Sequence, residues 1–233
     1  MLVVVALVVV VVALAGVVVV RSAGHGTPVA VPTAAPSRSP APVPDATYAP
    51  PPGTVIAAAP THVSVPVLGL DAVVQPYTVA DAEQGRNALT GTGCYADGRI
   101  TCIDPPTMGD VYWMQGGVGG VAFGDAPGTQ SQANVYLFGH ATDDGSGIFT
   151  RLYELQAGAS VEVSNPHGRL TYEVDQVVTV DKGDYTSLPL AVDQEPGKLL
   201  LVTCNHAPGA AARNGSATEN VVVAAHLVSS HPA

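Results

Sequence analysis

Basic residues are scarce in this chain of 233 residues. It carries only nine Lys and Arg residues against 19 Asp and Glu, so its formal net charge is −10. Binding to nucleic acid requires a basic patch that neutralises phosphates, and nine scattered basic residues do not supply one. We therefore exclude nucleic acid as a partner, and we attribute the acidity itself to ordinary solubility.

Cysteine is also rare, and the count of three is odd. Cys94 and Cys102 lie eight positions apart around Asp97-Gly98, a dipeptide typical of tight hairpin turns. A hairpin there would bring the two sulfurs together, so we expect a disulfide in an oxidising compartment. Cys204 is then left over, as a reactive thiol, as one half of an intermolecular disulfide, or as an inert buried residue.

Polar side chains are absent from residues 2–20, which form 19 consecutive apolar positions. This length is sufficient for a helix to cross the hydrocarbon core of a membrane. A cleaved signal peptide is the alternative, but its apolar region is usually about 7–15 residues long and follows a basic segment. We favour an uncleaved anchor over residues 1–20. Under the anchor interpretation, this is a single-pass protein of the cell membrane with its folded domain outside the cell.

The next segment, residues 21–53, contains nine of the 20 prolines, with Ala, Ser and Thr between them. Such a composition favours extended polyproline-like conformations and cannot bury a core. We expect a semi-stiff or disordered spacer over these residues. One folded domain over residues 54–233 is then expected to follow.

Within that domain the hydrophobic pattern favours strands over helices. About eight segments alternate or run apolar in the manner of strands, separated by turn residues: 62–67, 70–74, 111–114, 133–140, 160–163, 170–180, 199–204 and 220–228. Helix is expected only as short pieces, over 79–88 and 149–155. This combination predicts an all-β fold with a closed eight-stranded barrel rather than a parallel α/β fold.

Two of these strands end on residues that can carry chemistry. The apolar run 199–203 ends at Cys204, and the run 135–139 ends at His140 after a glycine. A cysteine nucleophile needs a base or a cation beside it, because the thiolate is the reactive form. Taken one at a time, either residue is more often structural. His206 would allow a metal site with Cys204 and His140, but their spacings match no common zinc pattern.

Four short segments, in this order, resemble the signature segments of sortases, the cysteine transpeptidases of Gram-positive bacteria: Phe138-Gly139-His140, Ile148-Phe149-Thr150-Arg151-Leu152, Leu201-Val202-Thr203-Cys204 and Asn220-Val221-Val222-Val223-Ala224. The resemblance covers residues 54–228. The apolar N-terminal segment and the Pro-rich linker also fit an actinobacterial sortase of the class E or F kind.

The resemblance implies a sortase barrel and a set of roles. Cys204 would attack a sorting signal of the Leu-Pro-x-Thr-Gly or Leu-Ala-x-Thr-Gly type on a secreted protein, and His140 would act as general acid and base. The acceptor would be an amine of a cell-wall peptide or of a pilin lysine, and no metal or organic cofactor is implied. The family also uses an arginine near the last strand, where class F relatives would place it at Thr218. The nearest arginine here is Arg213, which we take as the candidate for stabilising the oxyanion.

Two other functions stay open on the sequence alone. The displaced arginine is compatible with a membrane-tethered envelope binding or scaffold module that keeps the barrel without turnover. A thiol-dependent hydrolase of wall peptides is the third possibility. The catalytic interpretation requires Cys204 to be partly exposed at a barrel mouth, and a Cys204 sealed in the core would contradict it.

Overall fold

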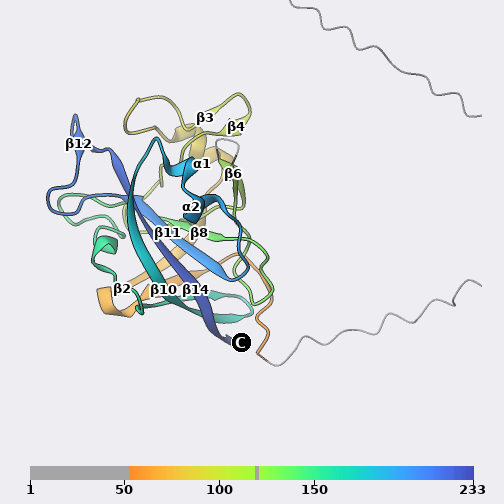
Figure 1. The fold of residues 1–233 in the computed structure, drawn as a ribbon. Coiled ribbons are helices and arrows are strands. Elements are labelled where there is room, and N and C mark those ends of the chain that lie inside the picture. Colours follow the sequence, from red (N-terminus) through yellow and green to blue (C-terminus); the bar gives the residue numbers. More distant parts are fainter. Residues whose placement is uncertain (1–52, 119–120) are drawn as a thin grey trace, which may run out of the picture. The chain divides into compact units, whose positions relative to one another are not determined.

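The computed structural model describes residues 53–118 and 121–233 (Figure 1). The anchor predicted over residues 1–20 lies outside the described residues, as does the linker predicted over 21–53 except for its last residue. Both stay predictions. Within the described ranges, no helix is both long enough and apolar enough to span a membrane.

Eight strands close into a barrel, in the order β1-β2-β5-β8-β11-β14-β10-β9. The strands are β1 (His62–Val65), β2 (Leu70–Pro76), β5 (Val111–Trp113), β8 (Val135–Phe138), β9 (Ser160–Asn165), β10 (Gly168–Asp181), β11 (Lys198–Cys204) and β14 (Glu219–Pro232). Each corresponds to one of the eight expected segments, so the prediction of a closed eight-stranded barrel is confirmed.

The remaining elements are short. Three two-stranded hairpins stand outside the barrel: β3–β4 (Tyr95–Ala96 and Arg99–Ile100), β6–β7 (Gly116–Val118 and Val121–Phe123) and β12–β13 (Ala212–Arg213 and Ser216–Ala217). The helices are η1 (Pro66–Leu68), α1 (Val79–Gln84), η2 (Leu152–Glu154), η3 (Tyr185–Ser187) and α2 (Pro189–Val192). The helix expected over 149–155 is thus a single 3₁₀ turn. The first strand stops at Val65 because Pro66 starts another such turn.

The barrel wall is apolar on both faces where β11 passes through it. Leu199 and Leu201 belong to a cluster drawn from all eight strands, which is the barrel interior. Leu200 and Val202 belong to a second cluster, on the outer face of the wall, which helices η3 and α2 also supply. A strand buried on both faces reads as a continuous apolar run rather than an alternating one. This accounts for the run at residues 199–202.

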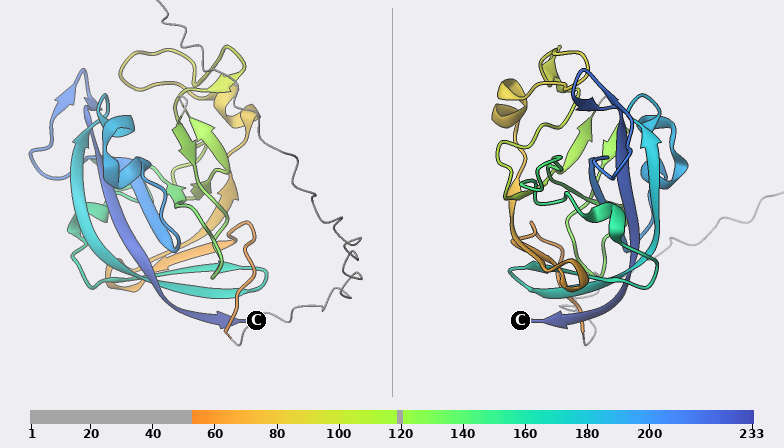
Figure 2. Two further views of the ribbon diagram at one scale, coloured as in Figure 1. Left: turned by 45° about the vertical axis from the view of Figure 1, so that its right-hand side comes forward. Right: turned by 90° about the vertical axis from the view of Figure 1, so that its left-hand side faces the viewer.

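The register of four consecutive strands positions the site. Strands β8 and β11 are parallel, with Val202 opposite Phe138. Strand β14 lies antiparallel to β11, with Asn220 opposite Cys204, and antiparallel to β10, with Asn220 opposite Val180. The long β10 and β14 run side by side over most of their length (Figure 2). The last residues of β8, β11 and β10 and the first of β14 therefore meet at one edge of the barrel.

The disulfide expected between Cys94 and Cys102 is present. It closes the small β3–β4 hairpin, whose turn residues Asp97 and Gly98 have φ of 51° and 75°. Both values lie in the left-handed region that Asp-Gly turns adopt. Cys204 is consequently the free cysteine of the chain.

Candidate active site

Side chains alternate between the two faces of a strand, and this places four polar residues on the outer face of the barrel wall. Phe138, Val202 and Val222 face the outer cluster. His140 comes two residues after Phe138, and Cys204 comes two residues after Val202. Asn220 comes two residues before Val222. Lys182 follows Val180 of β10 in the same way. These four residues, from four neighbouring strands, all line one pocket, which we call the outer-face pocket.

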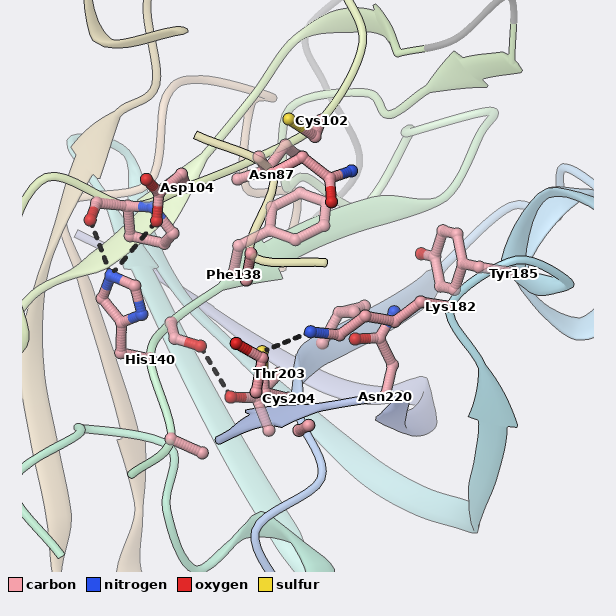
Figure 3. A pocket seen from close by; sticks show the side chains of 18 of the residues that line it. Asn87, Cys102, Asp104, Phe138, His140, Lys182, Tyr185, Thr203, Cys204 and Asn220 are labelled. Carbon is pink, nitrogen blue, oxygen red and sulfur yellow. Dashed lines mark hydrogen bonds and ion pairs between the residues drawn. The ribbon is translucent and has the colours of Figure 1, made fainter. Parts of the chain in front are cut away.

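The outer-face pocket has a volume of about 380 Å³. Phe138, Tyr185 and Cys102 are among the residues that line it (Figure 3), and Val202 lines it as well. The titratable and charged side chains that line it are Arg86, Asp104, His140, Lys182, Tyr185, Cys204 and His206. Sequence reasoning placed the site in the mouth of the barrel. The structure places it on the outer face instead, because Cys204 shares its face with Leu200 and Val202.

Cys204 is partly exposed, as the catalytic interpretation requires. Its strand end is fixed on both sides, because Asn205 N–H donates to the carbonyl of Glu219 at 2.9 Å, and the Thr203 hydroxyl donates to the carbonyl of Gly139 at 2.7 Å. The thiol therefore stands on a rigid backbone and opens into the pocket. A sealed, inert core thiol is not what the structure shows.

His140 is held by a polar contact on one side of its ring. Nε2 lies 2.7 Å from the carbonyl oxygen of Pro105 and 3.9 Å from Oδ1 of Asp104. Because a carbonyl only accepts, Nε2 must carry a proton and donate it. In the neutral ring, Nδ1 is then the nitrogen that is free to take a proton. Figure 3 shows the ring turned toward Asp104.

Asp104 was not anticipated from the sequence. Its carboxylate accepts from the backbone N–H of Arg86 at 2.9 Å, and its own N–H donates to the hydroxyl of Tyr77 at 3.2 Å. Burial raises the pKa of Tyr77, so that hydroxyl stays protonated. No local pattern distinguishes Asp104, because it belongs to an irregular loop that meets His140 only in the folded chain.

Gly139 explains why the two sequence segments on either side of the 141–147 loop pack together. A Cβ at this position would lie 2.8 Å from Ile148 and from Phe149, closer than real side chains approach. Phe149 N–H also donates to the carbonyl of His140 at 2.8 Å. Only glycine lets the strand pass this close to the segment that fixes His140.

Lys182 was also missed by sequence reasoning. Its Nζ lies 3.2 Å from Sγ of Cys204, and its backbone N–H donates to the carbonyl of Thr218 at 3.0 Å (Figure 3). A signal was available, because the alternation of Val178 and Val180 extends to Lys182. The strand expected over residues 170–180 stops two residues before Lys182.

Arg213, predicted as the oxyanion donor, is not brought to Cys204. It is exposed on the β12–β13 hairpin, opposite Ser216, and it is not among the residues that line the outer-face pocket. Thr218, where class F relatives would carry the arginine, bonds instead to the carbonyl of Ala211. The role of Arg213 as oxyanion donor therefore stays a prediction, and its exposed position does not favour that role.

A second hollow, of about 580 Å³, adjoins the first. His206 lines both, and its Nδ1 lies 2.7 Å from Oδ1 of Asp143. The neighbouring Asp144 accepts from the hydroxyl of Ser146, which lowers the pKa of Asp144 to about 2. In the described part of the chain, no group of three His, Cys, Asp or Glu residues is arranged to hold a metal ion.

A free thiol and an imidazole in one pocket are the groups that a cysteine nucleophile and its acid–base partner require, so this site is of the thiol-enzyme class. The family profile described as the sortase domain matches residues 63–228, and the chain belongs to the sortase family. Membership makes it a relative of cysteine transpeptidases that act on sorting-signal proteins and amine acceptors. No curated protein matches the chain.

Solved sortase structures are similar to this chain at low sequence identity. Sortase A of Listeria monocytogenes is 16% identical, with a TM-score of 0.46, over 76% of this chain and 92% of that one. Sortase A of Corynebacterium diphtheriae is 16% identical, with a TM-score of 0.47, over 76% and 64%. Sortase C1 of Streptococcus agalactiae is 20% identical, with a TM-score of 0.44, over 73% and 68%. We take no residue's role from them.

Proposed function

We propose that this protein is a cysteine transpeptidase that cleaves an LPXTG-like sorting signal on secreted proteins and joins it to an amine of a cell-wall peptide or a pilin lysine. The observation that carries the proposal is that Cys204 and His140 line the same pocket of a sortase-family barrel. Parallel pairing of β8 and β11 in register sets these two residues at equal distances past their last paired residues.

The proposed reaction has two steps. The thiolate Sγ of Cys204 attacks the carbonyl carbon of the scissile peptide bond, and the C=O electron pair moves onto the oxygen. The oxyanion then collapses, the C–N bond breaks, and the departing amine takes a proton from protonated His140. In the second step an incoming amine attacks the thioester, gives its proton to His140, and displaces Cys204 as thiolate. No cofactor enters these steps.

We place the folded domain outside the cell, anchored through residues 1–20. The long apolar segment and the Cys94–Cys102 disulfide support this placement, because disulfides persist in oxidising compartments. Protease treatment of intact cells tests it. An exported domain is degraded from outside, whereas a domain that survives until the cells are lysed contradicts the placement.

The activity is tested with the purified full-length chain in detergent. Fluorescent Leu-Pro-x-Thr-Gly and Leu-Ala-x-Thr-Gly peptides are incubated with glycine, lysine or diaminopimelate amines, and the products are identified by mass spectrometry. We expect an amide-linked product with the wild type and none with Cys204→Ala or His140→Ala. A sorting-signal mimic that carries a thiol-reactive group should label only the wild type. If Cys204→Ala is labelled as strongly, the enzyme proposal fails.

One observation favours a second candidate, a binding or scaffold module without turnover. Arg213 is exposed and does not line the pocket, although its hairpin partner Ser216 does, so the predicted oxyanion donor is not in place. The same assay separates the candidates, since a scaffold binds the peptide, by fluorescence anisotropy, without forming any product. A wall-peptide hydrolase would instead release a carboxylic acid whether or not an amine is present.

A further inference from the structure

The cation that the outer-face pocket presents to its thiol comes from β10. Val180 lies opposite Asn220, and Asn220 lies opposite Cys204 on the other side of β14. Lys182 is two residues beyond Val180, so it leaves the sheet at the same edge and on the same face as Cys204. Hydrogen bonds from Lys182 N–H to Thr218 and from Asp184 N–H to Asp181 fix this backbone.

The ammonium of Lys182 is directed at the sulfur. Nζ donates to Sγ of Cys204 at 3.2 Å, and the lysine is half-buried. In the described part of the chain, no ion pair ties this ammonium to a carboxylate. The other lysine, Lys198, is bound to Glu195 at 2.9 Å and does not line the pocket. The positive charge of Lys182 is therefore available to the thiol.

The other cations are less well placed. Arg86 lines the outer-face pocket, but its residue is exposed and the contact it makes there is a backbone N–H to Asp104. His140 is committed through Nε2 to Pro105. Arg213 stands on the exposed hairpin. Among the described cations, Lys182 is the one whose contact with Cys204 the structure shows.

We propose that Lys182 is a catalytic residue that stabilises negative charge first on Sγ of Cys204 and then on the oxyanion that forms beside it. This inference rests on the proposed function of Cys204 as nucleophile. An opposite charge at hydrogen-bond distance favours the thiolate. When the S–C bond forms and the C=O electron pair moves to oxygen, the negative charge leaves sulfur for an atom two bonds away. Lysine is a point charge on a flexible stem, so its ammonium can follow that charge.

Proton balance assigns the two partners different tasks. Lys182 keeps all its protons throughout, whereas His140 gives one to the departing amine and takes one from the incoming amine. The lysine therefore acts only through its charge and its N–H donors. Removing one oxyanion donor typically lowers turnover by about a hundredfold to a thousandfold, and we expect a loss of that order without Lys182.

The first experiment needs no peptide substrate. Cys204 is the free cysteine, so iodoacetamide alkylation of the full-length chain reports its reactivity across pH 5–10. We expect Lys182→Met to slow alkylation at pH 7 by about tenfold and to move the midpoint of the pH profile upward. Lys182→Arg should restore most of the rate. Arg169→Gln, which removes a cation from the β9–β10 surface, should leave it unchanged.

A wild-type profile for Lys182→Met would overturn the proposal. Near-ultraviolet circular dichroism checks that each variant is folded, and if Lys182→Met is not, Lys182→Gln takes its place. The second experiment measures sorting-peptide turnover. We expect Lys182→Met to lower kcat about a hundredfold with little change in KM, and Arg213→Ala to lower it far less. The reverse order would return the role to Arg213.

The two proposals fail in different ways. If no sorting peptide is cleaved by the wild type while alkylation still depends on Lys182, the transpeptidase proposal fails and the lysine–thiol interaction stands. If peptides are cleaved and neither assay responds to Lys182, the transpeptidase proposal stands and the lysine proposal fails.

Discussion

The strand ends that form the outer-face pocket and the β12–β13 hairpin beside them are held in different ways. Cys204 and Lys182 stand at the ends of strands that pair with barrel neighbours, so the register of the barrel sets their positions. The hairpin pairs only with itself, as a separate two-stranded sheet. A cation on a strand end therefore reaches the thiol, whereas Arg213 on the hairpin points into solvent. Three substitutions test this difference.

The largest effect is expected inside the barrel wall. Leu201 is fully buried in the interior, three residues before Cys204. Leu201→Ala should lower the free energy of unfolding by about 2–5 kcal/mol, because it removes apolar contacts and leaves a cavity. Urea denaturation measures this change. Val67→Ala, at an exposed position, should stay within about 0.5 kcal/mol, and equal losses would show that Leu201 is not tightly packed in the wall.

A smaller effect is expected at Gly139, which directly follows β8. Gly139→Ala would place a methyl group 2.8 Å from Ile148 and Phe149. We expect a loss of about 1–3 kcal/mol from overpacking, together with lower sorting-peptide turnover because His140 is displaced. Gly109→Ala is the matched control, since no atom lies within 4 Å of the added methyl group. If Gly139→Ala keeps wild-type stability and turnover, the close approach is not what positions His140.

The smallest effect is expected on the hairpin. Arg213→Ala should change the free energy of unfolding by no more than about 0.5 kcal/mol, because the side chain is exposed. Turnover should fall only slightly, measured with the same peptides. A hundredfold loss would show that the hairpin moves onto the pocket when substrate binds. Arg213 would then act at the thiol as a cation on a barrel strand end does.

The fold and the two central site residues could be predicted from the sequence because their signals are local. Apolar runs that end at His140 and Cys204 are visible in the chain itself, and so is the Asp97-Gly98 turn between two cysteines. Each of the eight strands carries its own pattern. The expected location at the mouth of the barrel was wrong, because residues 199–202 are buried on both sides and this removes the alternation that would reveal the face of Cys204.

The rest of the site depends on contacts that no local pattern encodes. Asp104 meets His140 through an irregular loop, and Lys182 meets Cys204 only through the register of β10, β14 and β11. The role of Arg213 stays a prediction, but its position on a hairpin has a signal in the sequence. Asn214-Gly215 is a two-residue hairpin dipeptide, and both residues have positive φ, at 54° and 79°. That turn fixes the arginine next to the tip of the hairpin, opposite Ser216.

The parallel pairing of β8 with β11 has a consequence for how this chain can change in length. Insertions into the surface loops between the two strands leave the thiol and the imidazole each two residues beyond the last paired residues of β8 and β11. Deleting a single residue within β11, between Leu199 and Thr203, would reverse the alternation of its side chains and turn the sulfur toward the barrel interior. Relatives of this chain should therefore differ in length at their loops, while the spacing from the last paired residue of each strand to its reactive side chain stays at two.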